Sequence, residues 1–275
     1  MAQAINAAFN FIGDLVMLPF QGSPWMAMFA WSVLIALLAM LAFKFCSNPD
    51  AIARTRNRVF AYILEFRLFK DDVLGVFGIF GRVLVGTLAY MKHYLTPIAV
   101  MIVPIVLLLI QMSTWFDYRP LEPGETALLT VTLNPDADVL KTPVTLSPSE
   151  GIEVDTEALR IPAENQLVWR LKAVSPNSCE PLELEAAGET VGKVCCTGSG
   201  MKKLSSSRIK GGFLAQLAHP AEPALPDNTT ISSIAIGYPR RELKIGNAGI
   251  NWLVAVFVLS IVFGLALKPM FKVEL

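Results

Sequence analysis

Residues 25–43 read WMAMFAWSVLIALLAMLAF and contain no charged side chain. At about 1.5 Å per residue, a helix of this length crosses the roughly 30 Å hydrocarbon core of a bilayer. The whole chain agrees, because 53% of its 275 residues are hydrophobic and its mean hydropathy is +0.51, more than a soluble surface tolerates. We therefore expect an integral membrane protein whose first transmembrane helix is residues 25–43.

Two further apolar stretches resemble the first. Residues 94–112 read YLTPIAVMIVPIVLLLIQM and lead into an aromatic cluster, which is typical of a membrane interface. Residues 250–267 begin beside Trp252 and are followed by Lys268. We expect these stretches to be the second and third transmembrane helices, with a short tail at residues 268–275.

The positions of Lys and Arg predict the orientation, because these residues favour the cytoplasmic side. The first 25 residues carry neither, whereas the loop 44–93 carries eight, which outweigh three cations near the outer end of the third span. We expect the loop and the tail in the cytoplasm, and the N-terminus and residues 113–249 outside it, in the periplasm of a bacterium whose inner (plasma) membrane holds the chain. The loop cations are Lys44, Arg54, Arg56, Arg58, Arg67, Lys70, Arg82 and Lys92, of which Arg54, Arg56, Arg58 and Arg67 are expected to form a basic face.

The N-terminal residues 1–24 have the pattern of an amphipathic helix that is too short to span. Apolar residues recur at three- and four-residue spacing, with Asn6, Asn10 and Asp14 elsewhere on the helical wheel. We expect a helix in the membrane interface; the alternative is the frayed start of the first span. The expected apolar face consists of Ile5, Phe9, Ile12, Val16 and Phe20.

The loop 44–93 is expected to form an amphipathic helical hairpin at the cytoplasmic surface. One helix should run from Pro49 to about Lys70, and a second covers the apolar stretch 73–91. That stretch is an alternative fourth span, but a central Arg82 costs about 2.5–3.5 kcal/mol on insertion scales, and four glycines lower its helix propensity.

Residues 113–249 change character, because prolines, threonines and short alternating runs replace the long apolar stretches. Several short strands bounded by turn residues predict an inserted all-β sandwich of immunoglobulin-like type. The run 167–172 (LVWRLK) alternates cleanly, so we expect Trp169 at the centre of the core. The expected strands are residues 127–133, 144–147, 152–154, 167–174, 182–186, 191–196 and 231–236, with a short helix at 213–218.

Two cysteines flank a predicted hairpin whose turn lies near Ala187 and Gly188. A two-residue turn there pairs positions that sum to 375, which matches Cys179 with Cys196; a shifted turn brings Cys195 to Cys179 instead. A structural disulfide is favoured over a redox site, since no Cys-x-x-Cys is present.

No catalytic, metal-binding or cofactor-binding motif stands out. The two histidines, His93 and His219, fall on opposite sides of the membrane in the expected topology, without acids or cysteines at ligand spacing. A net charge of zero argues against nucleic-acid binding. We expect no enzyme activity, no cofactor and no small-molecule substrate; the expected partners are the lipid bilayer and a protein in the periplasm or membrane.

The chain resembles a family of bacterial three-span membrane proteins of uncharacterised activity, best over residues 1 to about 130. The resemblance is carried by Phe43-Lys44 with residues 47–52 (SNPDAI), by residues 64–72 (LEFRLFKDD) and by residues 119–125 (RPLEPGE).

The membrane part is also similar in layout to the Oxa1 superfamily of insertases and biogenesis factors. The shared features are an outside N-terminus, a cytoplasmic hairpin, a second span bearing Pro97 and Pro104, and a third span ending at Lys268 and Lys272. The chain departs from that layout in its hydrophobic hairpin, in the β-domain between spans two and three, and in lacking a groove arginine within a span.

These patterns lead to one main functional hypothesis and two alternatives. The main one is a non-enzymatic scaffold or assembly factor whose periplasmic β-domain binds a protein partner. The resemblance to the Oxa1 superfamily implies the first alternative, an insertase or chaperone in membrane-protein biogenesis. The second is a structural subunit of a membrane enzyme or transporter.

Overall fold

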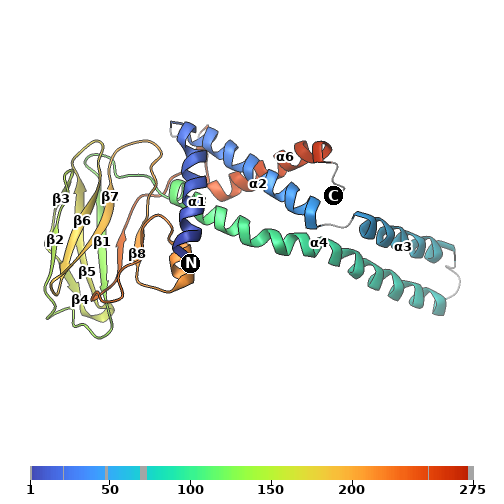
Figure 1. The fold of residues 1–275 in the computed structure, drawn as a ribbon, viewed down its shortest axis with the longest axis horizontal. Coiled ribbons are helices and arrows are strands. Elements are labelled where there is room, and N and C mark those ends of the chain that lie inside the picture. The colour runs from blue at the N-terminus through green and yellow to red at the C-terminus, as the bar shows by residue number, and fades with distance from the viewer. Residues whose placement is uncertain (1, 21, 47–48, 69–72, 247, 272–275) are drawn as a thin grey trace. The chain divides into compact units, whose positions relative to one another are not determined.

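The computed structural model describes residues 2–20, 22–46, 49–68, 73–246 and 248–271. They form two compact units, one made of the chain up to Ala30 with Leu107–Val256, and one made of Trp31–Val106 with the chain from Phe257 onward. Three long helices contribute residues to both units (Figure 1). Parts of the motifs that carry the resemblances, residues 47–48, 69–72 and Lys272, lie outside the described residues.

Three described helices are long and apolar enough to cross a membrane, which confirms this coarse prediction. The candidate spans are Pro24–Cys46, Pro97–Phe116 and Trp252–Phe271. The helices are α1 (Ala2–Met17), the 3-10 turn η1 (Leu18–Phe20), α2 (Pro24–Cys46), α3 (Pro49–Leu68), α4 (Val73–Phe116), α5 (Phe213–Ala218) and α6 (Trp252–Phe271).

Helix α4 corrects one expectation. The sequence predicts a break between the apolar stretch 73–91 and the span that begins at residue 94, but α4 is one helix of 44 residues that includes Pro97 and Pro104. Such a helix is about 66 Å long, roughly twice the thickness of a hydrocarbon core. The described α4 therefore contains no turn between the apolar stretch 73–91 and the candidate span Pro97–Phe116.

The β-domain (residues 117–250) consists of antiparallel sheets. The larger sheet has the order β3-β5-β1-β9-β8, with β4 also paired to β5, and a second sheet has the order β2-β6-β7. The strands of these two sheets are β1 (Thr126–Leu133), β2 (Val144–Ser147), β3 (Ile152–Val154), β4 (Leu159–Ile161), β5 (Gln166–Ala173), β6 (Cys179–Ala186), β7 (Glu189–Cys196), β8 (Ser207–Ile209) and β9 (Ile231–Ile236), and η2 (Pro162–Glu164) links β4 to β5.

The two sheets share one hydrophobic core. Alternate residues of β1, β5, β6, β7 and β9 are buried in it, including Trp169 at 4% exposure. The strands predicted from the sequence did not include the short strands β4 and β8. They also did not include the small hairpin formed by β10 (Leu243–Ile245) and β11 (Ala248–Ile250). That hairpin moves the start of the third long helix from Ile250 to Trp252.

The β6–β7 hairpin has the predicted turn. Ala187 and Gly188 both have positive φ, of 51° and 83°, which a two-residue hairpin turn requires and glycine adopts at no steric cost. The register places Cys179 opposite Cys196, and a disulfide joins these two residues.

Candidate functional site

Helix α1 is attached to the β-domain through its polar face. The Asn6 side-chain amide donates to the Gln216 carbonyl oxygen at 2.7 Å, and the Asn10 amide donates to that of Pro220 at 3.0 Å. Lys203 forms an ion pair with Asp14 at 2.9 Å. These contacts join residues about 190 to 210 positions apart, so they fix an N-terminal helix to the far end of the β-domain sequence.

A second contact joins α1 to the last turns of α4. Gln111 is buried at 1% exposure, and its side-chain amide donates to the side-chain oxygen Oδ1 of Asn10. Gly13 faces the same glutamine, and a Cβ at this position would lie 3.0 Å from Gln111 Cγ. Glycine therefore permits the close approach of the two helices.

The face of α1 next to the polar one is apolar and exposed, and it continues into η1. The large side chains on it are Phe11 at 69%, Leu15 at 60% and Leu18 at 70% exposure. The apolar face is thus rotated from the predicted one, because of the five predicted residues only Ile12 is exposed. Docking of Asn6 and Asn10 sets this rotation, which leaves the side chains of Phe11 and Leu15 exposed beside the polar face.

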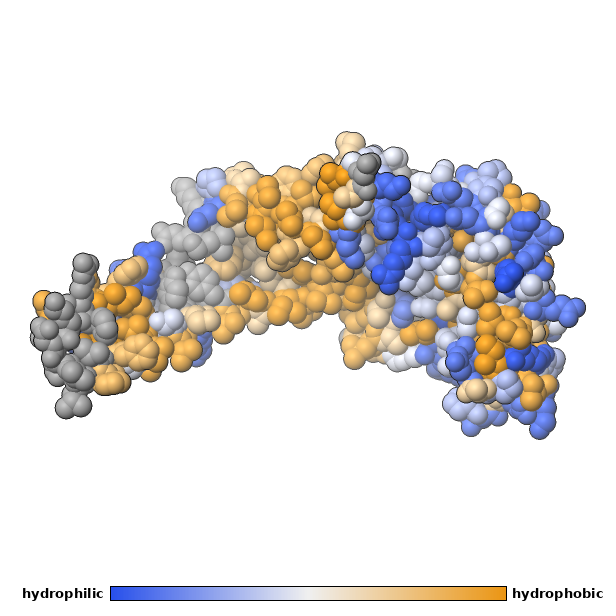
Figure 2. All heavy atoms as spheres, turned by 180° about the vertical axis from the view of Figure 1, so that it is seen from behind, coloured by the Kyte–Doolittle hydropathy of each residue, from blue (hydrophilic) through white to orange (hydrophobic). Residues whose placement is uncertain are grey.

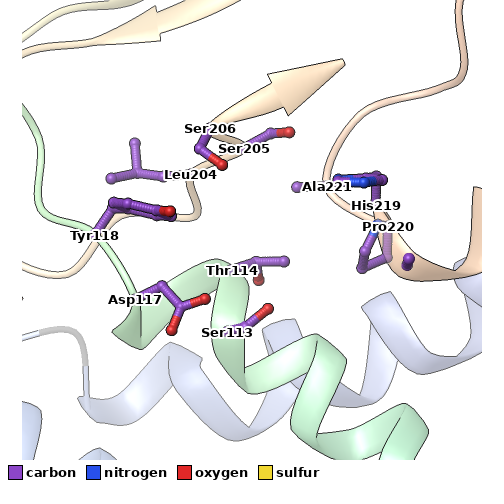
Figure 3. A pocket seen from close by; sticks show the side chains of 11 residues that line it. Ser113, Thr114, Asp117, Tyr118, Leu204, Ser205, Ser206, His219, Pro220 and Ala221 are labelled. Atoms are coloured by element: carbon purple, nitrogen blue, oxygen red, sulfur yellow. The ribbon is translucent and has the colours of Figure 1, made fainter. Parts of the chain in front are cut away.

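A polar cavity of about 170 Å³ lies where the end of α4 meets the segment around α5 (Figure 3). Ser113, Thr114 and Asp117 line it from α4 and the residue after it, and His219 from the loop after α5. Asp117 accepts a hydrogen bond from the Trp252 indole at 2.6 Å. This bond ties the Asp117 carboxylate to the first residue of α6.

His219 itself lies 3.3 Å, through Nδ1, from the Ser207 hydroxyl. Burial and then the nearby charge of Lys193 lower the pKa of His219, which favours the neutral imidazole.

A buried ion pair stands at the outer edge of β7. The Lys193 side chain is fully buried, and its Nζ lies 2.5 Å from the carboxylate of Glu222, which is 8% exposed. The ammonium also donates to the Ser205 carbonyl oxygen at 2.6 Å. Burial lowers the pKa of Lys193, and the Glu222 charge opposes this. Lys193 was not among the predicted site residues, although it alternates along β7 with the buried residues Val191 and Cys195.

Side chains from the segment after β7 cover the backbone of this edge. Glu222 accepts from the Val194 N–H at 2.8 Å, and the Arg208 guanidinium donates to the Gly192 carbonyl. Tyr238 Oη accepts from the Cys196 N–H at 3.1 Å and donates to the Val194 carbonyl at 3.4 Å. Burial raises the pKa of Tyr238 well above its usual value, so the hydroxyl keeps its proton.

An open groove of about 670 Å³ lies at the opposite edge of the same sheet, beside β2. It runs between β2 and the segment after β3, and Trp169 contributes to its lining. Its charged lining residues are Asp155 and Glu157. Asp155 lies 3.8 Å from Arg170 in a half-exposed ion pair, whereas Glu157 is exposed.

In the second unit, α3 and the first turns of α4 pack together through small contacts. Arg82 pairs with Glu65 at 2.9 Å and stacks over the Tyr62 ring, and a Cβ at Gly86 would lie 3.0 Å from Val59. Hydrophobic residues make up much of the surface of α3 and the first turns of α4, with some hydrophilic ones among them (Figure 2). Its exposed large side chains are Phe60, Ile63, Leu64, Leu68, Phe77, Phe80, Leu84, Val85, Leu88 and Met91.

The predicted basic residues lie on α3. Arg54, Arg56 and Arg58 are exposed on this helix, and the side chain of Arg67 lies outside the described part of the structure. Cys195 is a buried free thiol whose pKa is raised by burial, so it is a poor nucleophile. Among the described residues, no group of three His, Cys, Asp or Glu is placed to hold a metal ion.

Comparison with known proteins adds no relative. No protein-family model, curated protein or solved structure matches the chain.

Proposed function

We propose that this chain is a non-enzymatic assembly factor of a bacterial inner membrane, which holds a protein-binding β-domain at the periplasmic surface of the bilayer. The observation that carries the proposal is the docking of α1. Its polar residues Asn6, Asn10 and Asp14 are occupied by the β-domain, which leaves the apolar side chains of Phe11 and Leu15 free to enter the membrane interface.

We interpret the β-domain as an immunoglobulin-like sandwich, a fold that commonly presents sheet edges and loops to protein partners. Two antiparallel sheets around one core and the buried Trp169 support this interpretation. The periplasmic placement is supported by the cations between the first two spans and by the Cys179–Cys196 disulfide, which persists in oxidising compartments.

The orientation is tested by labelling single-cysteine variants with a membrane-impermeant thiol reagent in spheroplasts. In a background with Cys46 and Cys195 replaced by alanine, a cysteine at exposed Glu150 is expected to react and one at exposed Asn57 is not. The reverse pattern would invert the protein and end the proposal.

The protein-binding role is tested by photo-crosslinking in intact cells. A photoreactive amino acid is placed in turn at exposed positions of the β-domain, with α3 position Asn57 as the matched control. Discrete protein adducts from one surface of the β-domain are expected. If no position of the β-domain yields an adduct, the scaffold function is wrong.

A second candidate function, an Oxa1-like insertase or chaperone, is favoured by the α3–α4 surface. Helix faces that expose this much apolar area are stable when covered by lipid or by another apolar helix. A photoreactive residue at Leu84 is then expected to crosslink to the transmembrane segment of a ribosome-bound nascent chain, and one at Arg54 much less. Equal or absent crosslinking at both positions contradicts capture of such segments by this surface.

A further inference from the structure

The three-stranded sheet has two outer edges. Side chains cover the β7 edge, whereas on the β2 side the described hydrogen bonds reach only the Thr142 carbonyl before the strand, which accepts from Arg160 at 3.0 Å. The Ala187 N–H donates to the Pro143 carbonyl at 3.5 Å, and the β2–β6 register then directs the N–H and C=O of Thr145 and Ser147 toward β6. The same alternation directs the N–H and C=O of Val144 and Leu146 away from the sheet. Among the described residues, no hydrogen bond reaches these outward groups.

The corresponding groups of β7 are occupied, as the contacts of Gly192, Val194 and Cys196 show. In the larger sheet, the edge strand β8 is also covered, because the Ser205 hydroxyl donates to the Ser207 carbonyl and the Leu225 N–H to that of Ile209; β3 and β4 form the other edge. Proteins usually cover such edges, since an open edge pairs with other strands. The open edge of β2 is therefore able to pair with another strand.

We propose that β2 binds an extended polypeptide segment of a partner protein, one that alternates apolar and basic residues and adds as a fourth strand. The groove beside β2 supplies the surface for alternate apolar side chains, with Trp169 and Leu146 in its lining. The basic character follows from charge complementarity, because the two charged residues of the lining are Asp155 and Glu157.

The length of β2 limits the length of the segment that can pair with it. Pro143 and Pro148 bracket the four residues of β2, so the paired part of a ligand is about four residues long. Short main-chain pairing of this kind gives weak, reversible binding. This inference rests on the proposed scaffold function and names the chemistry of its partner.

The test uses the full-length chain in nanodiscs of zwitterionic lipid and a fluorescent eight-residue peptide that alternates Val and Lys. Anisotropy is expected to show binding at least tenfold tighter than that of a Val–Glu peptide or of a Val–Lys peptide with two central residues replaced by proline. On binding, amide exchange is expected to slow in residues 143–148 and not in 190–196. Equal binding of the proline-containing peptide overturns strand addition.

Two substitutions locate the site. Leu146→Pro removes an outward N–H without removing a β2–β6 hydrogen bond, and it is expected to weaken binding at least tenfold. Glu157→Lys, an exposed change that leaves the core intact, is expected to weaken it severalfold, whereas Glu164→Lys, the same charge change at an exposed acid outside the groove, leaves it unchanged. Wild-type binding by Glu157→Lys, or an equal loss in both charge variants, overturns the proposal.

Two outcomes separate this inference from its alternatives. Self-association of the full-length chain that is lost in Leu146→Pro would make a second copy the occupant of the edge, which overturns the proposal. Photo-crosslinks from other β-domain surfaces but none from Thr145 or Ser147 would also overturn it while leaving the scaffold function standing. Absence of adducts from the whole β-domain would contradict the scaffold function itself.

Discussion

The two outer edges of the β2–β6–β7 sheet differ in whether side chains hydrogen-bond to their outward backbone groups. The β7 edge carries a buried ion pair, a buried tyrosine hydroxyl and an arginine, all of which bind its backbone. The β2 edge is four residues long, lies between two prolines and borders an open groove. The covered edge is expected to contribute to stability, and the open edge to be available for binding.

The largest effect is expected from breaking the ion pair at the covered edge. Glu222→Ala leaves the buried Lys193 without a counter-ion and the Val194 N–H without an acceptor. Removal of one partner of a buried pair costs about 3–5 kcal/mol of unfolding free energy. Urea-dependent pulse proteolysis of the full-length protein measures this loss.

The matched control is the double variant Lys193→Met with Glu222→Leu, in which no charge is left buried. Replacement of a buried ion pair by apolar residues is often close to neutral. A double variant as unstable as Glu222→Ala would mean that the pair itself, rather than the orphaned charge, stabilises the edge.

The disulfide is expected to add roughly 3 kcal/mol to the unfolding free energy, the amount estimated for a disulfide that closes a loop of about 15 residues. It joins residues 17 positions apart, Cys179 and Cys196, at the end of the covered strand. Replacing both by alanine should lower the unfolding free energy of the β-domain by that amount in the same assay. Cys46→Ala, in the other unit, serves as the control and is expected to change it by less than about 0.5 kcal/mol.

A smaller effect is expected from Tyr238→Phe. The Cys196 N–H then loses its acceptor in a buried position, which costs about 1–3 kcal/mol. No comparable cost is expected for Thr145→Val at the open edge, because the Thr145 side chain is exposed. Equal stabilities for the two variants would remove the distinction between the edges.

The smallest effect concerns pH. The pKa of His219 is lowered in the folded protein, so below its usual value of 6.5 the unfolded chain binds the proton more readily than the folded chain. Stability from this group is complete above that pH and is lost as pH falls through the folded pKa. Between pH 7 and 5 the unfolding midpoint is expected to fall, and His219→Gln should flatten this slope; an unchanged slope would assign it to other groups.

Local patterns in the sequence predicted many elements of the β-domain. Short alternating or apolar runs between turn residues placed β2, β3 and β9 at their observed bounds, and the turn at Ala187 and Gly188 set the register that pairs Cys179 with Cys196. The uncharged runs likewise predicted three helices long enough to cross a membrane. These features depend on neighbouring residues, which is why periodicity and turn chemistry find them.

Long-range contacts explain what the sequence could not predict. The face of α1 that is exposed depends on Asn6 and Asn10 meeting carbonyl groups about 210 residues away. The alternation along β7 indicates that Lys193 points inward. Its partner Glu222 lies 29 residues later in the chain, so no local pattern could predict the ion pair.

The sequence by itself determined the apolar helices, most strands and the disulfide hairpin, because hydrophobic periodicity and turn residues act over a few positions. Only the tertiary structure decided that α4 is unbroken, that α1 turns its polar face to the β-domain, and that β7 is covered while β2 is open. These features depend on which distant backbone groups find a hydrogen-bond partner, and that is settled only when the whole chain has packed.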